Sequence, residues 1–166
     1  PLPPFTREYE AYQFAFTELK EAGTLYEKVQ KWCDRNAKNR VVISLYGGSG
    51  SGKTTLATAL QQYFLNDGKG CYLLSGDNYP HRIPKRNDEE RMRVYKETGE
   101  DGLRGYLGTK KEIDFDRINE VLAAFHEGND QITLKHMGRE DGDISYEETD
   151  FSGISVMLLE WTHGGS

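Results

Sequence analysis

Residues 47–54, which read GGSGSGKT, directly follow the apolar run 41–46, which reads VVISLY. Their spacing fits G-x-x-x-x-G-K-[ST], and a helical pattern of apolar residues comes next. Glycines allow successive backbone N–H groups to turn toward one anion, because a Cβ atom would forbid several of the required φ/ψ values. A helix that begins near Gly52 points its N-terminal amides at the same place. The order of strand, loop and helix therefore predicts a binding site for the phosphates of a nucleoside triphosphate.

The end of this loop carries the polar groups that phosphate and metal need. The Lys53 ammonium can lie between the β- and γ-phosphates, and the Thr54 hydroxyl can bind Mg²⁺. A flexible Gly/Ser linker would account for the glycines, but not for the Lys-Thr ending or the flanking elements. The residues expected to hold the phosphates are Gly47, Gly48, Ser49, Gly50, Ser51, Gly52, Lys53, Thr54 and Thr55.

Composition limits the class of protein. The chain has 166 residues, of which 36% are hydrophobic, and its formal net charge is −6. This length is enough for one globular domain with a core, and the acidic balance weighs against general nucleic-acid binding. The sequence shows no apolar run of membrane-spanning length and no leader pattern, so we expect a soluble, cytoplasmic protein without nucleic-acid or membrane partners. Cys33 and Cys71 are expected to be reduced packing residues.

Hydrophobic periodicity predicts an alternation of helices and strands. Residues 1–38 are expected to form a helical segment in two pieces, divided at Gly23, that packs on a core of residues 39–166. The expected strands are 41–46, 71–75, 131–135 and 154–159, and the expected helices of the core are 53–65 and 116–127. Residues 79–110 are charged and poor in apolar periodicity, so they are interpreted as an insertion with a helix around 88–96. Residues 138–152 are acidic and rich in turn residues, which makes them a candidate hairpin.

Two acidic residues are placed where predicted strands end. Asp77 comes two residues after strand 71–75, and Glu160 comes directly after strand 154–159. Taken alone, Asp77 fits an ordinary turn and Glu160 a solvent-facing charge. Ligands of open parallel sheets bind at the carboxyl ends of the strands, so both are expected to face the phosphate loop. Asp77 is therefore assigned as the base for an acceptor hydroxyl, and Glu160 as a carboxylate for magnesium or substrate. The expected catalytic residues are Asp77, Lys53 and Glu160, and the expected metal ligands are Thr54, Glu160 and Asp77.

Four segments occur in the order GGSGSGKTT, SGDNYP, EIDFDRINEVLAAFHEG and VMLLEWTHG. In this order they resemble the uridine kinase and phosphoribulokinase-like family of P-loop kinases, over residues 41–163. The resemblance implies an α/β, P-loop NTPase-type three-layer sandwich with a parallel sheet, and ATP and Mg²⁺ as cofactors. It also implies that Asp77 activates the acceptor hydroxyl and that Glu160 lies near the metal and the substrate.

Two segments depart from the family pattern. Residues 134–139 read LKHMGR where uridine kinases carry Tyr-Asp and His, and Trp161 follows Glu160 where the family has Gly. These departures weigh against uridine and predict a differently shaped acceptor pocket. The basic residues just after Asp77 could bind an anionic acceptor, although a solvated basic loop accounts for them equally well. The expected substrate residues are Tyr79, Arg82, Lys85, Arg86, His136, Arg139 and His163.

The sequence thus predicts a kinase that phosphorylates a hydroxyl of a nucleoside, sugar, sugar phosphate or hydroxy acid. The alternative is a nucleotide-dependent switch in which the triphosphate orders the insertion 79–108 for a partner; the absence of an N-K-x-D sequence weighs against a GTPase of this kind. Members of the similar family continue with an arginine-rich lid and further strands, whereas six residues follow Glu160 here. We therefore expect a fold that is incomplete at the C-terminus and needs a C-terminal complement or self-association.

Overall fold

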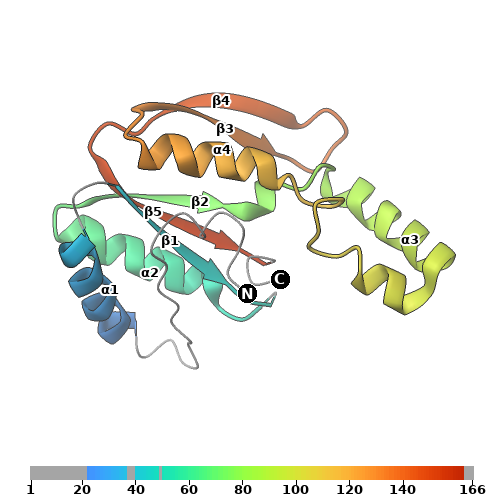
Figure 1. The fold of residues 1–166 in the computed structure, drawn as a ribbon, viewed down its shortest axis with the longest axis horizontal. Coiled ribbons are helices and arrows are strands. Elements are labelled where there is room, and N and C mark those ends of the chain that lie inside the picture. Colours follow the sequence, from blue (N-terminus) through green and yellow to red (C-terminus); the bar gives the residue numbers. More distant parts are fainter. Residues whose placement is uncertain (1–21, 37–39, 49, 163–166) are drawn as a thin grey trace.

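The computed structural model describes residues 22–36, 40–48 and 50–162, which Figure 1 shows as coloured ribbon. The helices are α1 (Ala22–Asn36), α2 (Lys53–Asn66), the short 3-10 helix η3 (Gly76–Asn78), α3 (Pro84–Arg104) and α4 (Phe115–His126). The strands are β1 (Val41–Tyr46), β2 (Gly70–Ser75), β3 (Gln131–Met137), β4 (Ile144–Asp150) and β5 (Ile154–Trp161). Helices and strands therefore alternate along most of the chain, as the hydrophobic pattern predicts.

Three parallel strands form the main sheet, in the order β1-β5-β2. The unit β1–α2–β2 therefore does not join neighbouring strands, because β5 lies between β1 and β2. Near the carboxyl ends of the strands, Glu160 lies opposite both Leu45 of β1 and Ser75 of β2. This order brings the end of β5 between the two places where β1 and β2 run into their following loops.

Side chains of β5 enter two hydrophobic cores, one on each face of the sheet. Met157 and Leu159 belong to the core that contains α4 and β3, whereas Val156 and Leu158 belong to the core that contains α1 and α2. The alternation follows from the period of two in a strand, and it explains why β5 is almost continuously apolar. The three layers are visible in Figure 1, with α1 and α2 on one side of the sheet and α4 with the hairpin on the other. The predicted α/β three-layer sandwich with a parallel sheet is confirmed.

The acidic segment 138–152 was a candidate hairpin, but it supplies only the turn and the second strand of one, because its strand β4 pairs with the preceding strand β3. Strands β3 and β4 pair antiparallel as a separate two-stranded sheet. Ile132 and Leu134 of β3 lie in the core against α4, while most residues of β4 are exposed. The predicted strand 131–135 was too short, because the polar end of β3 continues as far as Met137.

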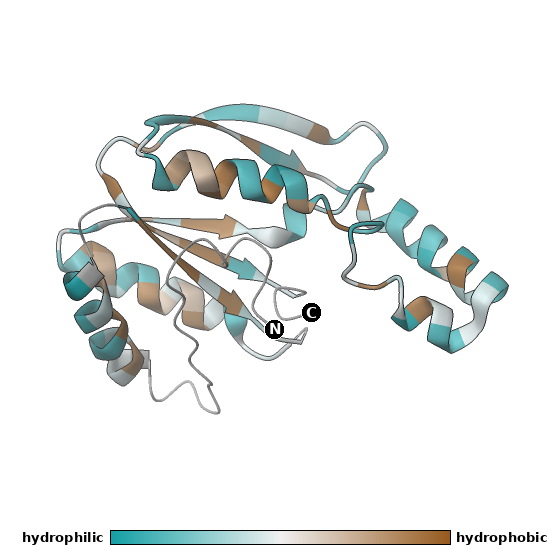
Figure 2. Cartoon of the chain, in the orientation of Figure 1, coloured by the Kyte–Doolittle hydropathy of each residue, from teal (hydrophilic) through white to brown (hydrophobic). Residues whose placement is uncertain are grey.

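The insertion is more helical than predicted. Helix α3 runs from Pro84 to Arg104 and bends at Gly99, which has φ 71° and ψ −165°. The expected helix 88–96 is only a part of it, because charged residues hide the apolar pattern. Figure 2 shows α3 as mostly hydrophilic, in contrast to the more hydrophobic strands of the main sheet. In Figure 1 α3 projects from the body of the molecule, to which its base is joined by an antiparallel bridge between Pro80 and Ile113.

Other element boundaries differ slightly from those predicted. Strand β5 extends through Trp161. Glu160 was expected to come directly after this strand, but it is the last but one residue within it. Gly23, the expected break, lies in the first turn of α1, and the helix predicted before it falls outside the described residues. Cys33 and Cys71 are buried free thiols in the α1–α2 core, as expected. None of the helices in the described ranges is long and apolar enough to cross a membrane.

Candidate active site

The phosphate loop has the backbone geometry that its glycines permit. Gly50 and Gly52 have φ values of 75° and 87°, in the left-handed region that residues with a Cβ atom rarely adopt. Gly52 is the N-cap residue of α2, and its carbonyl accepts a hydrogen bond from the Leu56 amide at 3.0 Å. The helix therefore begins at the loop, and its first amides face the position where an anion would bind. Ser49 lies outside the described residues.

Lys53 lies against the loop that it follows. Its ammonium donates a hydrogen bond to the carbonyl oxygen of Gly48 at 3.0 Å. The Ser51 amide donates to the same carbonyl at 3.2 Å, which closes the loop into a tight turn. An ammonium held against a glycine-rich loop at the start of a helix is the arrangement that binds the outer phosphates of a nucleotide.

Thr54 and Glu160 come together from two different elements. The Thr54 hydroxyl, in the first turn of α2, donates a hydrogen bond to Oε1 of Glu160 at 3.2 Å. Glu160 is only 9% exposed, because it belongs to the central strand β5, whereas Thr54 is exposed. A hydroxyl and a carboxylate side by side next to a phosphate loop are oxygen ligands of the kind that Mg²⁺ prefers.

This pair fits a metal ion that also binds phosphate oxygens. Within the described part of the chain, no group of three or more His, Cys, Asp or Glu side chains could hold a metal ion. Mg²⁺ usually keeps several waters and binds through one or two protein oxygens plus substrate phosphates. The residues present thus suit Mg²⁺ that arrives with a nucleotide, and they do not form an all-protein metal cage.

Asp77 also lies at the carboxyl ends of the strands, in the short helix η3 that follows β2. Its side chain is exposed, while its neighbour Gly76 packs against the side chain of Trp161. A Cβ atom added at Gly76 would lie 2.2 Å from Cβ of Trp161, so only glycine fits this contact. Since Ser75 lies opposite Glu160 in the sheet, Asp77 follows two residues beyond the level of Glu160 on the neighbouring strand. The structure therefore brings Asp77, the predicted base, to the same end of the sheet as the phosphate loop.

Tyr79, predicted to contact substrate, is instead a core residue. Its side chain is 0% exposed and packs in the hydrophobic core with α4. The GDNYP sequence continues directly from the exposed Asp77 into the interior, so the polar neighbour suggested an exposure that the tyrosine does not have. The prediction that Tyr79 contacts substrate is wrong for this conformation.

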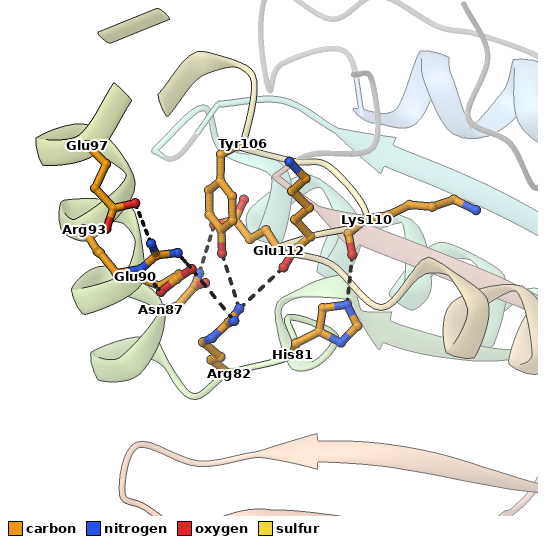
Figure 3. Close-up of polar contacts among 10 residues, drawn as sticks. His81, Arg82, Asn87, Glu90, Arg93, Glu97, Tyr106, Lys110 and Glu112 are labelled. Carbon is orange, nitrogen blue, oxygen red and sulfur yellow. Dashed lines mark hydrogen bonds and ion pairs between the residues drawn. The ribbon is translucent and has the colours of Figure 1, made fainter. Parts of the chain in front are cut away.

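The predicted cations of the insertion are mostly engaged with the chain itself. Arg82 donates to the Tyr106 hydroxyl at 3.4 Å and to the Lys111 carbonyl at 3.4 Å, and Figure 3 shows this contact with Tyr106. Arg86 binds Asp141 through two parallel hydrogen bonds of 3.0 and 2.7 Å, and it also binds Glu89. The Arg86 guanidinium holds the pKa of the Asp141 carboxyl below its usual value. The Arg86–Asp141 contact joins the start of α3 to the turn of the hairpin.

The remaining predicted substrate residues are less constrained. Nε2 of His136 lies 3.8 Å from a carboxylate oxygen of Glu147, across the hairpin. Lys85 and Arg139 are exposed, on α3 and on the hairpin turn respectively. His163 lies outside the described residues. Among the described members of this group, Lys85 and Arg139 are therefore the exposed cations.

Sequence reasoning missed a buried carboxylate that lies just after the insertion. Glu112 is 0% exposed and accepts hydrogen bonds from Nδ2 of Asn87 at 3.0 Å, Nε of Arg91 at 2.6 Å and the Gly108 amide at 2.6 Å. Burial opposes its ionisation, but these donors outweigh burial and hold the pKa of Glu112 below its usual value. Figure 3 shows Glu112 near Asn87 of α3, with His81 on the segment before α3. No local pattern marks Glu112, because its partners are up to 25 residues away in the sequence.

The comparisons with known proteins agree with this architecture. The family model of adenylylsulphate kinase matches residues 39–100, which include the phosphate loop and Asp77. A bifunctional alpha-galactosidase/sucrose kinase from Mediterraneibacter gnavus is 91% identical over all 166 residues, and the chain spans 18% of that protein's length.

Solved structures share the fold at low sequence identity. A D-glycerate 3-kinase from Cryptococcus neoformans var. grubii superposes with a TM-score of 0.54 and 17% identity, covering 84% of this chain and 51% of the other. A structure from Bacillus stearothermophilus described as a "possible uridine kinase" gives 0.52 and 20%, covering 82% and 71%. The resemblance to P-loop kinases is thus confirmed at the level of the fold, while the uridine kinase family itself is not singled out. The chain has the fold of a P-loop kinase.

Proposed function

We propose that this chain is the nucleotide-binding part of an ATP-dependent kinase that phosphorylates a hydroxyl group of a small molecule. The observation that carries the proposal is the 3.2 Å contact between Thr54 and Glu160 at the start of α2, beside the phosphate loop. A loop that merely bound an anion would need neither a hydroxyl nor a buried carboxylate at this position. Both are needed where a metal ion must bridge the protein and the phosphates.

Each group of the site has a defined part in this reaction. The loop amides and Lys53 would bind the phosphates, and Thr54 with Glu160 would hold Mg²⁺, which neutralises phosphate charge when bound. Asp77 would orient the acceptor hydroxyl and take its proton. The acceptor oxygen forms a bond to the γ-phosphorus as the bond from that phosphorus to ADP breaks, and the proton on Asp77 passes to solvent.

The acceptor that we propose is a sugar. The relative from Mediterraneibacter gnavus, 91% identical over this chain, has sucrose kinase in its name. The contacts of the insertion also suit an uncharged acceptor, because Arg82 and Arg86 are already bonded to groups of the chain itself. An anionic acceptor such as adenylyl sulfate, which the matching family model suggests, would have to compete with Asp141 for Arg86.

Acceptor-dependent ATP consumption tests this proposal. The full-length protein that carries this chain would be incubated with MgATP and with sucrose, glucose, fructose, adenylyl sulfate or no acceptor. We expect a sugar phosphate with sucrose, and expect Asp77→Asn to lower transfer by about 10²–10⁴-fold while nucleotide affinity is kept. Slow ATP hydrolysis that no acceptor stimulates would instead favour the nucleotide-dependent switch. Phosphorylated product from adenylyl sulfate alone would refute the proposal that the acceptor is a sugar.

We also propose that further polypeptide covers the outer edge of β1. In the described part of the chain, β1 pairs with β5 on one side, and no strand pairs with its other edge. An apolar strand with an open edge tends to pair with another chain. The rest of a longer protein or a second copy could supply this cover. Light scattering on the isolated 166-residue chain tests this, since a stable compact monomer would contradict it.

A further inference from the structure

Lys135 is a buried lysine for which the proposed reaction has no use. It lies on β3 and is 3% exposed. Burial lowers the pKa of Lys135 below its usual value, while the charge of Asp114 opposes this shift. Burying an ammonium costs free energy unless the group is well bonded, and a methionine of similar length would avoid that cost. The position of the lysine therefore calls for a reason other than packing.

The contacts of Lys135 lead to the segment that carries Asp77. Its Nζ donates a hydrogen bond to the carbonyl oxygen of Pro80 at 2.7 Å. Pro80 comes three residues after Asp77, between the short helix η3 and helix α3. A second link lies two residues further along β3, where the Met137 amide donates to Oδ1 of Asn78 at 3.3 Å.

The two links hold the backbone on the side of Asp77 that leads to the insertion. On the other side, Gly76 packs against Trp161, so this side of the short helix is fixed by the main sheet. The Tyr79 amide also donates to the Gly76 carbonyl at 3.0 Å, which closes the turn around Asp77. The exposed carboxylate of Asp77 thus lies on a short loop whose neighbours are anchored to β5 and to β3.

We propose that Lys135 is a positioning residue for Asp77: its buried ammonium fixes the Pro80 carbonyl, and with Asn78 it holds the turn that aims the carboxylate at the acceptor hydroxyl. This inference rests on the proposed function of Asp77 as the base. A displacement of about 1 Å in a reacting group can cost on the order of 10²-fold in rate, so a modest loosening of this turn is enough to be measured.

The test compares Lys135→Met and Asn78→Ala with Lys69→Met in the full-length protein, using MgATP and the sugar acceptor. Lys69 is a suitable control because its ammonium pairs with Asp34 at 2.9 Å, on the α1 side of the molecule. We expect Lys135→Met to lower kcat by about 10–100-fold while the Kd of MgATP changes less than about twofold. Its thermal midpoint should stay close to that of the wild type, because the removal of a buried charge offsets the loss of the hydrogen bond to the Pro80 carbonyl. Asn78→Ala should lower kcat in the same way, to a smaller extent.

A double variant separates positioning from general damage. If Lys135 acts through Asp77, then Lys135→Met should lower the rate less than about threefold when Asp77→Asn is already present, because residues that act as one unit are not additive. A kcat of Lys135→Met close to that of the wild type, or equal losses in both backgrounds, would overturn the inference. If Lys135→Met does not fold, Asn78→Ala takes its place: its kcat is compared with that of the wild type, and its effect is measured again in the Asp77→Asn background.

The same set of proteins separates failure of the inference from failure of the proposed function. A wild type that transfers no phosphate to any acceptor would refute the kinase function, and an Asp77→Asn variant with full activity would refute the role of Asp77 as the base. Loss of activity in Asp77→Asn combined with full activity in both Lys135→Met and Asn78→Ala would refute the positioning role alone.

Discussion

The phosphate loop and the insertion after Asp77 both follow strands that flank β5, but different interactions hold them. The phosphate side, meaning residues 47–54 with Glu160, is fixed by backbone geometry and by contact with the central strand. The acceptor side, meaning residues 76–114 with the hairpin turn 138–143, is held by charged side chains such as Arg86 and Glu112. A backbone cradle suits the phosphates, which are the same for every nucleotide, whereas side-chain contacts can change with the acceptor. Substitutions on the two sides should therefore have separable effects.

The largest effect is expected on the phosphate side, from Lys53→Met. This variant removes the ammonium at the loop, so the rate of phosphoryl transfer should fall by on the order of 10²–10³-fold. The thermal midpoint should hardly change, because within the described ranges the side chain makes one hydrogen bond, to the Gly48 carbonyl. Steady-state kinetics and thermal unfolding would be measured together, with Lys31→Met on α1 as the matched control. A variant that kept more than about a tenth of the wild-type rate would contradict this role.

A smaller effect is expected on the acceptor side from Glu112→Gln, and it should be a loss of stability, not of nucleotide binding. The amide cannot satisfy Arg91 and the Gly108 amide together, so the free energy of unfolding should fall by about 3 kcal/mol at pH 7. Nucleotide affinity should be retained, because the side-chain hydrogen bonds of Glu112 go to residues of the insertion, away from the phosphate loop. Urea denaturation measures the loss. Glu120→Gln is the control, since Glu120 pairs with Arg117 on the surface and surface pairs contribute little.

The effect of Glu112 should also depend on pH. Its pKa in the folded protein lies below the ordinary value of 4.5, so the unfolded state binds more protons in this range. The stability that the carboxylate supplies is present above pH 4.5 and is lost as the pH falls through the lower pKa of the folded state. The difference in unfolding free energy between the wild type and Glu112→Gln should therefore shrink on acidification. A difference that stayed constant down to pH 3 would contradict the ionised, hydrogen-bonded Glu112.

The smallest effect is expected from Arg86→Ala. The ion pair of Arg86 with Asp141 joins α3 to the hairpin turn, but both side chains are at least half exposed. Exposed pairs of this kind stabilise a protein little, so the thermal midpoint should not change measurably, with or without added salt. Asp141→Asn should behave in the same way. A clear loss of stability in both variants would contradict this, and would show that the Arg86–Asp141 contact is needed to hold the start of α3 in place.

The phosphate side was largely predictable from sequence because its signals are local. A loop motif between an apolar strand and an amphipathic helix involves neighbouring residues, and β1 and α2 were predicted within one residue of their observed bounds. The position of Glu160 near the carboxyl end of the sheet was expected from the rule that ligands bind where parallel strands end. Even so, the sequence did not indicate that β5 would lie between β1 and β2.

The acceptor side was predicted less well because its contacts join distant residues. Arg86 reaches Asp141 across 55 positions, and Lys135 reaches Pro80 across the same number. Tyr79 was misassigned because the hydrophobic core that buries it is completed by α4 and β5, far along the chain. Periodicity and spacing describe one element at a time, so they do not reveal which charges meet when the elements pack.

The contact between Gly76 and Trp161 has a consequence for how the two halves of the site move. Gly76 precedes Asp77, and Trp161 follows Glu160, so one pair of touching residues stands next to both carboxylates. A shift of the indole that opened the turn at Asp77 would also pull on the end of β5. The proposed base and the proposed metal ligand would therefore move together, so that a change where the acceptor binds would reach the metal position without passing through the nucleotide.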